Sequence, residues 1–155
     1  MSQVTVRAFR AGDEAAFKAL NVEWIEHFFA LEPKDIEALN NPGRILADGA
    51  IAMAELDGEL VGTCALIKRP EPGMWEIAKM GVTTRHRGAG IGSALMGYLV
   101  EVAPTLGAKQ LYIETNSALA PAIRVYEKFG FRHLNDGEHP ETPYARADVF
   151  MLREV

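Results

Sequence analysis

Hydrophobic and polar positions in the first third of the chain predict one strand followed by two helices. Residues 4–9 alternate apolar and polar side chains, which is typical of a half-buried strand. Asp13 favours the start of a helix that continues to about Phe29, because a carboxylate there can accept a hydrogen bond from a free N–H of the first turn. Four-residue spacing indicates the apolar stripe of this helix, formed by Ala16, Leu20, Trp24 and Phe28. Pro33 suits the first turn of a second, short helix that ends near Leu39.

The following segments have the pattern of strands separated by turns. A loop is expected at residues 40–43, where two asparagines precede a proline and a glycine. The apolar runs 51–56 and 60–67 flank Asp57-Gly58, a strong signal for a tight hairpin. Prolines and a glycine then break the chain, and a fourth strand is predicted at residues 75–83.

In the second half of the chain, helical and extended patterns alternate. The predicted elements are a helix at 92–103, a strand at 110–115, a helix at 121–129 and closing strands at 131–134 and 148–153. A polar, proline-containing loop separates the two closing strands. This order of elements is typical of an α/β fold with a mixed sheet, and the length is that of a single domain over residues 1–155.

Composition and charge narrow the class of protein. Hydrophobic residues make up 48% and charged residues 24%, which is ordinary globular usage. The net charge of -5 argues against a general binder of nucleic acid or of membrane surfaces. Cys64 is the single cysteine and excludes an internal disulfide. Without a signal-like or membrane-spanning apolar stretch, we expect a cytoplasmic protein.

The segment from Met80 to Ser93 has the features of a phosphate-binding loop. A predicted strand enters it and a helix leaves it, while three closely spaced glycines and a helix N-terminus can direct backbone N–H groups at an anion. A P-loop is excluded, because Gly92 is followed by Ser93 without a lysine. A dinucleotide site fits the glycine spacing poorly but stays open, since Glu114 ends the next strand where a ribose-binding acid could lie.

Two motifs resemble those of the GNAT N-acetyltransferase superfamily. Arg87-x-x-Gly90-x-Gly92 is similar to the family's R/Q-x-x-G-x-G/A motif. Downstream, Asn116 and the block 121–131, with its Tyr126 and Gly130-Phe131, resemble the second family motif in the spacing seen in a branch of small bacterial members. The resemblance implies a mixed, mostly antiparallel sheet of about seven strands flanked by four helices, with strands four and five splayed apart.

The resemblance also implies acetyl-CoA as cosubstrate, with its pantetheine arm between the splayed strands. The implied cofactor-binding residues are Met80, Gly81, Val82, Arg87, Gly88, Ala89, Gly90, Ile91, Gly92, Ser93 and Asn116. The first three would pair with pantetheine through their backbone, as a strand would. The loop amides would hold the pyrophosphate, and Asn116 would bond the arm from the facing strand.

Acetyl transfer to an amine calls for a proton donor and a proton acceptor. Tyr126 matches the family tyrosine whose hydroxyl approaches the cofactor sulfur, which makes it the expected general acid; a core aromatic residue is the alternative. Glu76 resembles the fourth-strand glutamate that serves as a base in histone-type members, and a surface ion pair is its alternative. The four histidines show no metal-ligand spacing, so no metal is expected.

The acceptor is expected to enter from the side of the first two helices and the loop before the last strand. The candidate acceptor-binding residues there are Trp24, Glu26, Phe28, Tyr144 and Arg146. A mixture of Arg146 with acids suits a zwitterionic small-molecule amine. Acetylation of a protein N-terminus or lysine, and a non-catalytic acetyl-CoA sensor, remain as alternatives. No nucleic-acid or membrane partner is expected, and a homodimer is left open.

Overall fold

The computed structural model describes residues 3–86 and 88–155 and contains the predicted strands and helices. In chain order the elements are β1 (Thr5–Ala8), α1 (Glu14–Phe28), α2 (Pro33–Leu39), α3 (Pro42–Leu46), β2 (Ala50–Leu56), β3 (Glu59–Lys68), β4 (Met74–Val82), η1 (Thr84–His86), α4 (Ile91–Val102), η2 (Ala103–Leu106), β5 (Gln110–Thr115), α5 (Ala120–Lys128), β6 (Arg132–His133) and β7 (Val149–Glu154). The short helix α3 replaces the second half of the loop predicted at 40–43, so at least five α-helices flank the sheet rather than four. Pro42 occupies the first turn of α3, where its missing N–H costs nothing.

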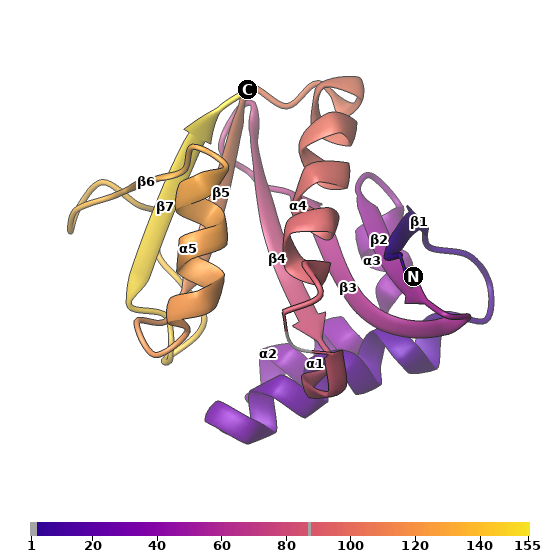
Figure 1. The fold of residues 1–155 in the computed structure, drawn as a ribbon. Coiled ribbons are helices and arrows are strands. Elements are labelled where there is room, and N and C mark those ends of the chain that lie inside the picture. The colour runs from indigo at the N-terminus through magenta and orange to yellow at the C-terminus, as the bar shows by residue number, and fades with distance from the viewer. Residues whose placement is uncertain (1–2, 87) are drawn as a thin grey trace.

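The sheet has seven strands in the order β1-β2-β3-β4-β5-β7-β6 (Figure 1). Neighbouring strands are antiparallel except β4 and β5, which are parallel. The parallel pairing of β4 with β5 ends at Glu76 and Tyr112. Beyond this point, β4 continues to Val82 and β5 to Thr115 without pairing to each other. The predicted splay between the fourth and fifth strands is therefore confirmed.

Helices cover both faces of the sheet. On one face α4 and α5 lie side by side (Figure 1), and the largest apolar core forms beneath them, around Leu95, Met96 and Leu99. On the other face α1, α2 and α3 enclose a second core that includes Phe17 and Met53. In the described part of the chain, no helix combines the length and apolar character needed to cross a bilayer.

The buried face of α1 differs from the predicted stripe. Its buried residues are Phe17, Leu20, Asn21 and Ile25, whereas Phe28 is 47% exposed. An α-helix has about 3.6 residues per turn, so a strict four-residue repeat drifts around the axis and leaves the buried face within a few turns. Of the four predicted residues, Leu20 alone is buried, with 6% of its surface exposed.

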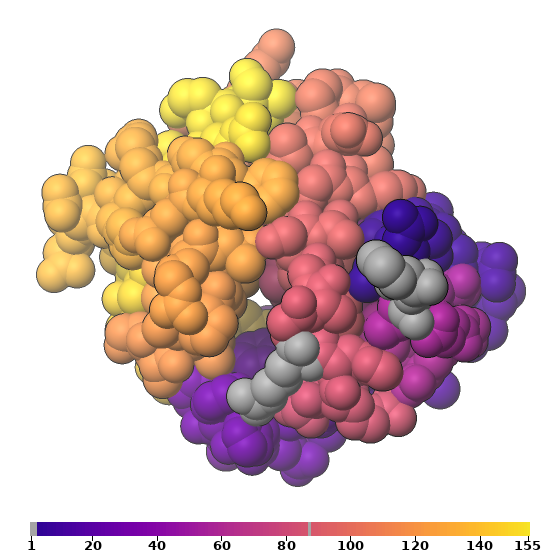
Figure 2. All heavy atoms as spheres, in the orientation of Figure 1, coloured from indigo at the N-terminus to yellow at the C-terminus, as the bar shows by residue number. Residues whose placement is uncertain are grey.

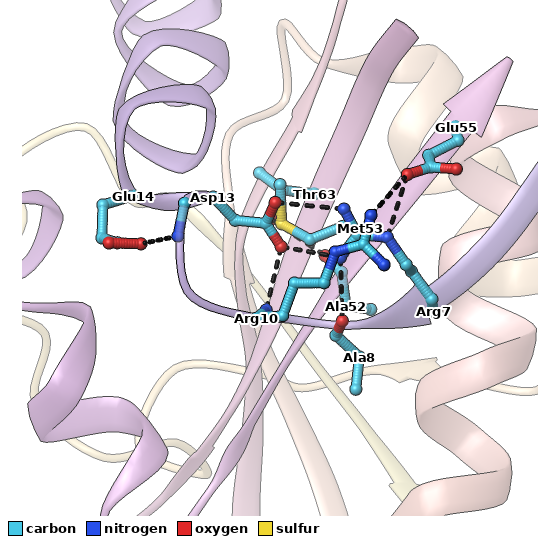
Figure 3. Close-up of polar contacts among 10 residues, drawn as sticks. Arg7, Ala8, Arg10, Asp13, Glu14, Ala52, Met53, Glu55 and Thr63 are labelled. Atoms are coloured by element: carbon cyan, nitrogen blue, oxygen red, sulfur yellow. Dashed lines mark hydrogen bonds and ion pairs between the residues drawn. The ribbon is translucent and has the colours of Figure 1, made fainter. Parts of the chain in front are cut away.

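Asp13 precedes α1 as predicted but does not cap it with its side chain. Its carboxylate instead accepts hydrogen bonds from both terminal nitrogens of Arg7, at 2.7 and 3.0 Å, and from the backbone N–H of Arg10 (Figure 3). The Nε of Arg7 donates to Glu55 on β2 at 2.9 Å. This network ties β1, the start of α1 and β2 together, and the Arg7 guanidinium lowers the pKa of Asp13 below its usual range.

Candidate active site

A cleft of about 230 Å³ lies where β4 and β5 separate. Its lining comprises Glu76, Ile77, Ala78, Lys79, Met80 and Val82 of β4; Glu114, Thr115, Asn116 and Leu119 of β5 and the next loop; Ala122 and Tyr126 of α5; and Trp24, Ile25, Phe29, Asp35, Tyr144, Arg146 and Ala147. Figure 2 shows the surface hollowed between the orange α5 region and the pink β4–α4 region, above the purple helices. The cleft thus connects the α5 side of the sheet with the side covered by α1 and α2.

A bulge in β4 decides which of its side chains point to each side. Gly81 pairs with Thr63 and Ala78 with Ala65, so two residues, Lys79 and Met80, oppose one residue of β3. Lys79 has a φ of 55°, a left-handed conformation that costs a non-glycine residue on the order of 1 kcal/mol. The extra residue reverses the alternation: Lys79 lines a second cavity toward α2 and α3, while Met80 packs against the α4–α5 core.

Tyr126 extends from the apolar face of α5 to the opening between the strands. Its ring is buried, and its hydroxyl lies 3.9 Å from the sulfur of Met80, a weak acceptor. Burial raises the pKa of Tyr126, so the hydroxyl remains protonated across the physiological range. The ring of Tyr126 thus has the position of a core aromatic residue, while its protonated hydroxyl lies at the cleft, as a general acid requires.

Glu76 lies on the α1–α3 side of β4. Its side chain is 15% exposed and forms an ion pair with Arg69, with Nη1 and Oε1 2.7 Å apart. Burial, and next the negative charge of Glu114, raise the pKa of Glu76 to about 7 in spite of Arg69. Glu76 thus forms an ion pair, as the alternative to a catalytic role predicted. It also has a pKa near neutrality, which suits a general base.

Glu114, near the end of β5, accepts hydrogen bonds from two neutral donors. The hydroxyl of Tyr112 lies 2.9 Å from one carboxylate oxygen, and Thr142 Oγ1 lies 2.6 Å from the other. Because Thr142 belongs to the loop before β7, Glu114 holds that loop against β5. The carboxylate still lines the cleft.

The glycine-rich loop has a backbone that leaves space for an anion. Gly88 and Gly90 have φ values of 79° and 74°, and a Cβ added to either would meet nothing within 4 Å. Gly90 immediately precedes α4, whose first turn has no acidic side chain and no side-chain cap, so its N–H groups remain available. Arg87, the predicted motif arginine, lies outside the described residues. Its neighbour Arg85 pairs with Glu59.

The remaining predicted cofactor residues occupy the loop and the two splayed strands. Ala89 is exposed, Gly92 and Ser93 are partly exposed, and the side chain of Ile91 is buried in the core. Gly81 lies directly under α1: an added Cβ would come within 2.7 Å of the Leu20 backbone. Asn116 faces the cleft, but its amide nitrogen donates to the Arg146 carbonyl at 2.7 Å and its oxygen accepts from the Ala118 N–H.

Three of the five predicted acceptor-binding residues line the cleft: Trp24, Tyr144 and Arg146. Arg146 forms a two-pronged ion pair with the fully buried Asp35, at 2.5 and 2.7 Å, and a third contact with Glu32 at 3.2 Å. Glu26 and Phe28 are exposed on α1, outside the cleft lining. Both are exposed because α1 buries the face that contains Phe17, Asn21 and Ile25.

Sequence reasoning missed Lys79 and Asp35. The Nζ of Lys79 donates to the Tyr144 hydroxyl at 2.6 Å, and Asp35 anchors Arg146 from the first turn of α2. The spacing of Glu32 and Asp35 around Pro33 does indicate a capping box, which the structure contains. A sequence signal for Lys79 is lacking, because its place depends on the bulge.

Comparison with known proteins agrees with this geometry. The model of the acetyltransferase (GNAT) family matches residues 14–131. Human N-acetylaspartate synthetase is 33% identical over 91 residues, which cover 59% of this chain and 30% of that protein. The uncharacterized N-acetyltransferase YjgM of Escherichia coli is 34% identical over 105 residues, 66% of this chain and 62% of that protein. The chain thus spans less than two thirds of the length of these relatives.

A solved structure shares the fold over nearly the whole chain. The yncA acetyltransferase of Salmonella typhimurium, solved with its cofactor acetyl-CoA, superimposes with a TM-score of 0.76. The match covers 97% of this chain and 93% of that chain at 21% sequence identity.

Proposed function

The chain belongs to the acetyltransferase (GNAT) family, and on this premise we propose that it transfers the acetyl group of acetyl-CoA directly to the primary amine of a small molecule. The observation that carries the proposal is the cleft through the opening between β4 and β5. It presents a protonated hydroxyl, Tyr126, on the α5 side and a carboxylate with a pKa near 7, Glu76, on the other side.

Acetyl-CoA supplies an activated acyl group, and features of the chain fit its pyrophosphate and its pantetheine arm. Gly88 and Gly90 let the loop and the first turn of α4 direct backbone N–H groups at a pyrophosphate. Beyond Glu76, the edge of β4 that faces β5 is not paired with that strand, so the backbone from Met80 to Val82 can pair with the pantetheine amides. Asn116 lines the β5 side of the same opening.

The proton transfers are assigned to the two groups whose pKa values suit them. A primary amine has a pKa near that of lysine, about 10.4, so it arrives as an ammonium and must lose a proton. Glu76 accepts that proton, directly or through water. A backbone N–H of the unpaired β4 edge donates to the carbonyl oxygen, and Tyr126 donates its proton to the departing thiolate.

The enclosure of the acceptor side favours a small molecule. Arg146 binds the loop before β7 to the start of α2 through Asp35 and Glu32, which closes this side of the cleft. The whole cleft has a volume of about 230 Å³, below the range of about 300–1,000 Å³ typical of drug-sized ligands. N-acetylaspartate, the compound in the name of the human relative, is a small acetylated amine.

The test is a screen of acceptors with purified protein and acetyl-CoA. The panel contains amino acids, other small amines, and peptides with a free N-terminus or an internal lysine. Free thiol is followed over time, and mass spectrometry identifies the acetylated product. We expect steady thiol release that requires a small amine, with one acetyl group on its nitrogen.

Two results would overturn the proposal. A preference for peptides over every small amine would assign the activity to protein acetylation. Acetyl-CoA binding by calorimetry, without thiol release from any acceptor, would indicate a sensor.

A further inference from the structure

In the described part of the chain, Lys79 forms no ion pair with a carboxylate. Asp35 and Glu76 lie close enough to act on its charge, but Asp35 pairs with Arg146 and Glu76 pairs with Arg69. The ammonium donates one hydrogen bond, to the hydroxyl of Tyr144 at 2.6 Å. Since an ammonium has three donors, two of them remain for another acceptor.

The hydroxyl of Tyr144 also has a free donor. It accepts a hydrogen bond from Lys79, but its own proton has no acceptor among the residues that the structure describes. The ring is held in place, because the guanidinium of Arg146 lies 4.7 Å from its centroid and is itself fixed by Asp35. The Tyr144 hydroxyl and the Lys79 ammonium therefore form a pair of donors, and the Arg146 guanidinium adds a second positive charge beside them, as an anion would require.

A carboxylate without a bound cation lies on the same wall. Glu114 accepts from Tyr112 and Thr142, both neutral, and forms no ion pair with a described residue. Glu76, Lys79, Glu114 and Tyr144 line both the cleft and an adjacent cavity of about 310 Å³ toward α2 and α3. The wall shared by the two cavities thus offers separate sites for a positive and a negative group.

We propose that Lys79 and Tyr144 bind a carboxylate of the acceptor, so that the substrates are amines that carry a carboxylate, as amino acids do. This inference rests on the proposed function and specifies its acceptor. The ammonium group of such a molecule lies toward Glu76 and Glu114, where it loses its proton, and its side group extends into the second cavity. Arg146 positions Tyr144, since its charge is paired with Asp35 and Glu32 through three hydrogen bonds and its guanidinium lies against the Tyr144 ring.

The experiment compares amino acids with their carboxamides as acceptors, in the wild type and in Lys79→Met, Lys79→Arg, Tyr144→Phe and Lys68→Met. Lys68 ends β3, the strand next to β4, but it is exposed and lines neither cavity, which makes it the matched control. We expect Lys79→Met to lower kcat/KM for the carboxylates about 10- to 100-fold, mainly through KM, because a hydrogen-bonded charge loses its partner. The carboxamides should change little, Lys79→Arg should restore part of the loss, Tyr144→Phe should show a smaller loss, and Lys68→Met none.

A second readout separates this inference from the proposed function. Calorimetry measures the binding of the same amino acids and of acetyl-CoA to each variant. Binding of amino acids that depends on Lys79, with acetyl-CoA affinity unchanged, supports the carboxylate site even if no transfer occurs. Equal losses for carboxylates and carboxamides, or no loss for either, would refute the site while leaving amine acetylation in place.

Discussion

The hydroxyl of Tyr126 on α5 lies 3.9 Å from the sulfur of Met80 on β4, across the opening between β4 and β5. In the described part of the chain, the hydroxyl has no stronger acceptor. A buried hydroxyl with a weak partner contributes little to stability, because its desolvation is poorly compensated. The bulge at Lys79 turns Met80 to this side, so the fold brings a protonated group to the edge of the opening by a local distortion of β4.

Tyr126→Phe should therefore lower kcat while leaving the affinity for acetyl-CoA unchanged. Loss of a general acid reduces rates by about 10²–10⁴-fold, and the ring that fills the core is retained. Steady-state kinetics and calorimetry measure the two quantities. Tyr98→Phe, on α4, removes a hydroxyl that has no hydrogen-bond partner among the described residues, and it should keep full activity. Equal rates for the two variants would leave Tyr126 as a core aromatic residue.

Glu76→Gln should remove the acidic limb of the pH–rate profile. A base must be deprotonated, so wild-type kcat/KM should rise with pH through about 7, the raised pKa of Glu76. Glutamine cannot take the proton, and the rate should fall by about 10²-fold or more. Glu71→Gln is the matched control, because Glu71 also pairs with Arg69, at 2.6 Å, but does not line the cleft. An acidic limb that stays in place in Glu76→Gln would identify the carboxylate as a partner of Arg69 only.

Much of the fold follows from local patterns in the sequence. Alternating apolar residues predicted the first strand, and apolar runs predicted the next two. Asp57-Gly58 predicted the hairpin between them, in which both residues have positive φ. The splay between β4 and β5 followed from the resemblance of two motifs, since no local pattern indicates where a parallel pairing ends. Proline and glycine correctly indicated the ends of α5: Pro121 lies in its first turn, and Gly130 follows its last residues.

The acceptor side of the site could not be predicted in the same way. Strict alternation from Trp75 and Ile77 would place Lys79 on the face of α4, and the bulge alone turns it to the other face. The ion pair of Arg146 with Asp35 joins residues 111 positions apart, and only tertiary packing brings them together. Local periodicity contains no information on either feature.

Gly90→Val should weaken the binding of acetyl-CoA at least tenfold, a change of about 1.4 kcal/mol. A side chain there meets nothing in the protein within 4 Å, so its branched carbons would occupy the space that the pyrophosphate needs. Calorimetry measures the affinity. Gly107→Val is the control, because Gly107 has a similar φ of 86° and equal space but follows η2, beyond the C-terminal end of α4. If both variants bind acetyl-CoA equally well, the loop does not hold the pyrophosphate.

Arg7→Met should lower the free energy of unfolding at pH 7 by about 1–3 kcal/mol, because the buried carboxylate of Asp13 loses its main hydrogen-bond partner. The pKa of Asp13 is lowered in the folded protein, chiefly by Arg7. Its contribution is therefore fully present above its unfolded pKa, about 3.9, and disappears as pH falls through the lower folded value. Urea denaturation at pH 7 and pH 3 should show a difference between wild type and variant that shrinks in acid. Arg10→Met, whose side chain is 68% exposed, should change stability little at either pH. A difference that is constant with pH would mean that Arg7 stabilises the fold through the packing of its aliphatic stem and not through the charge of Asp13.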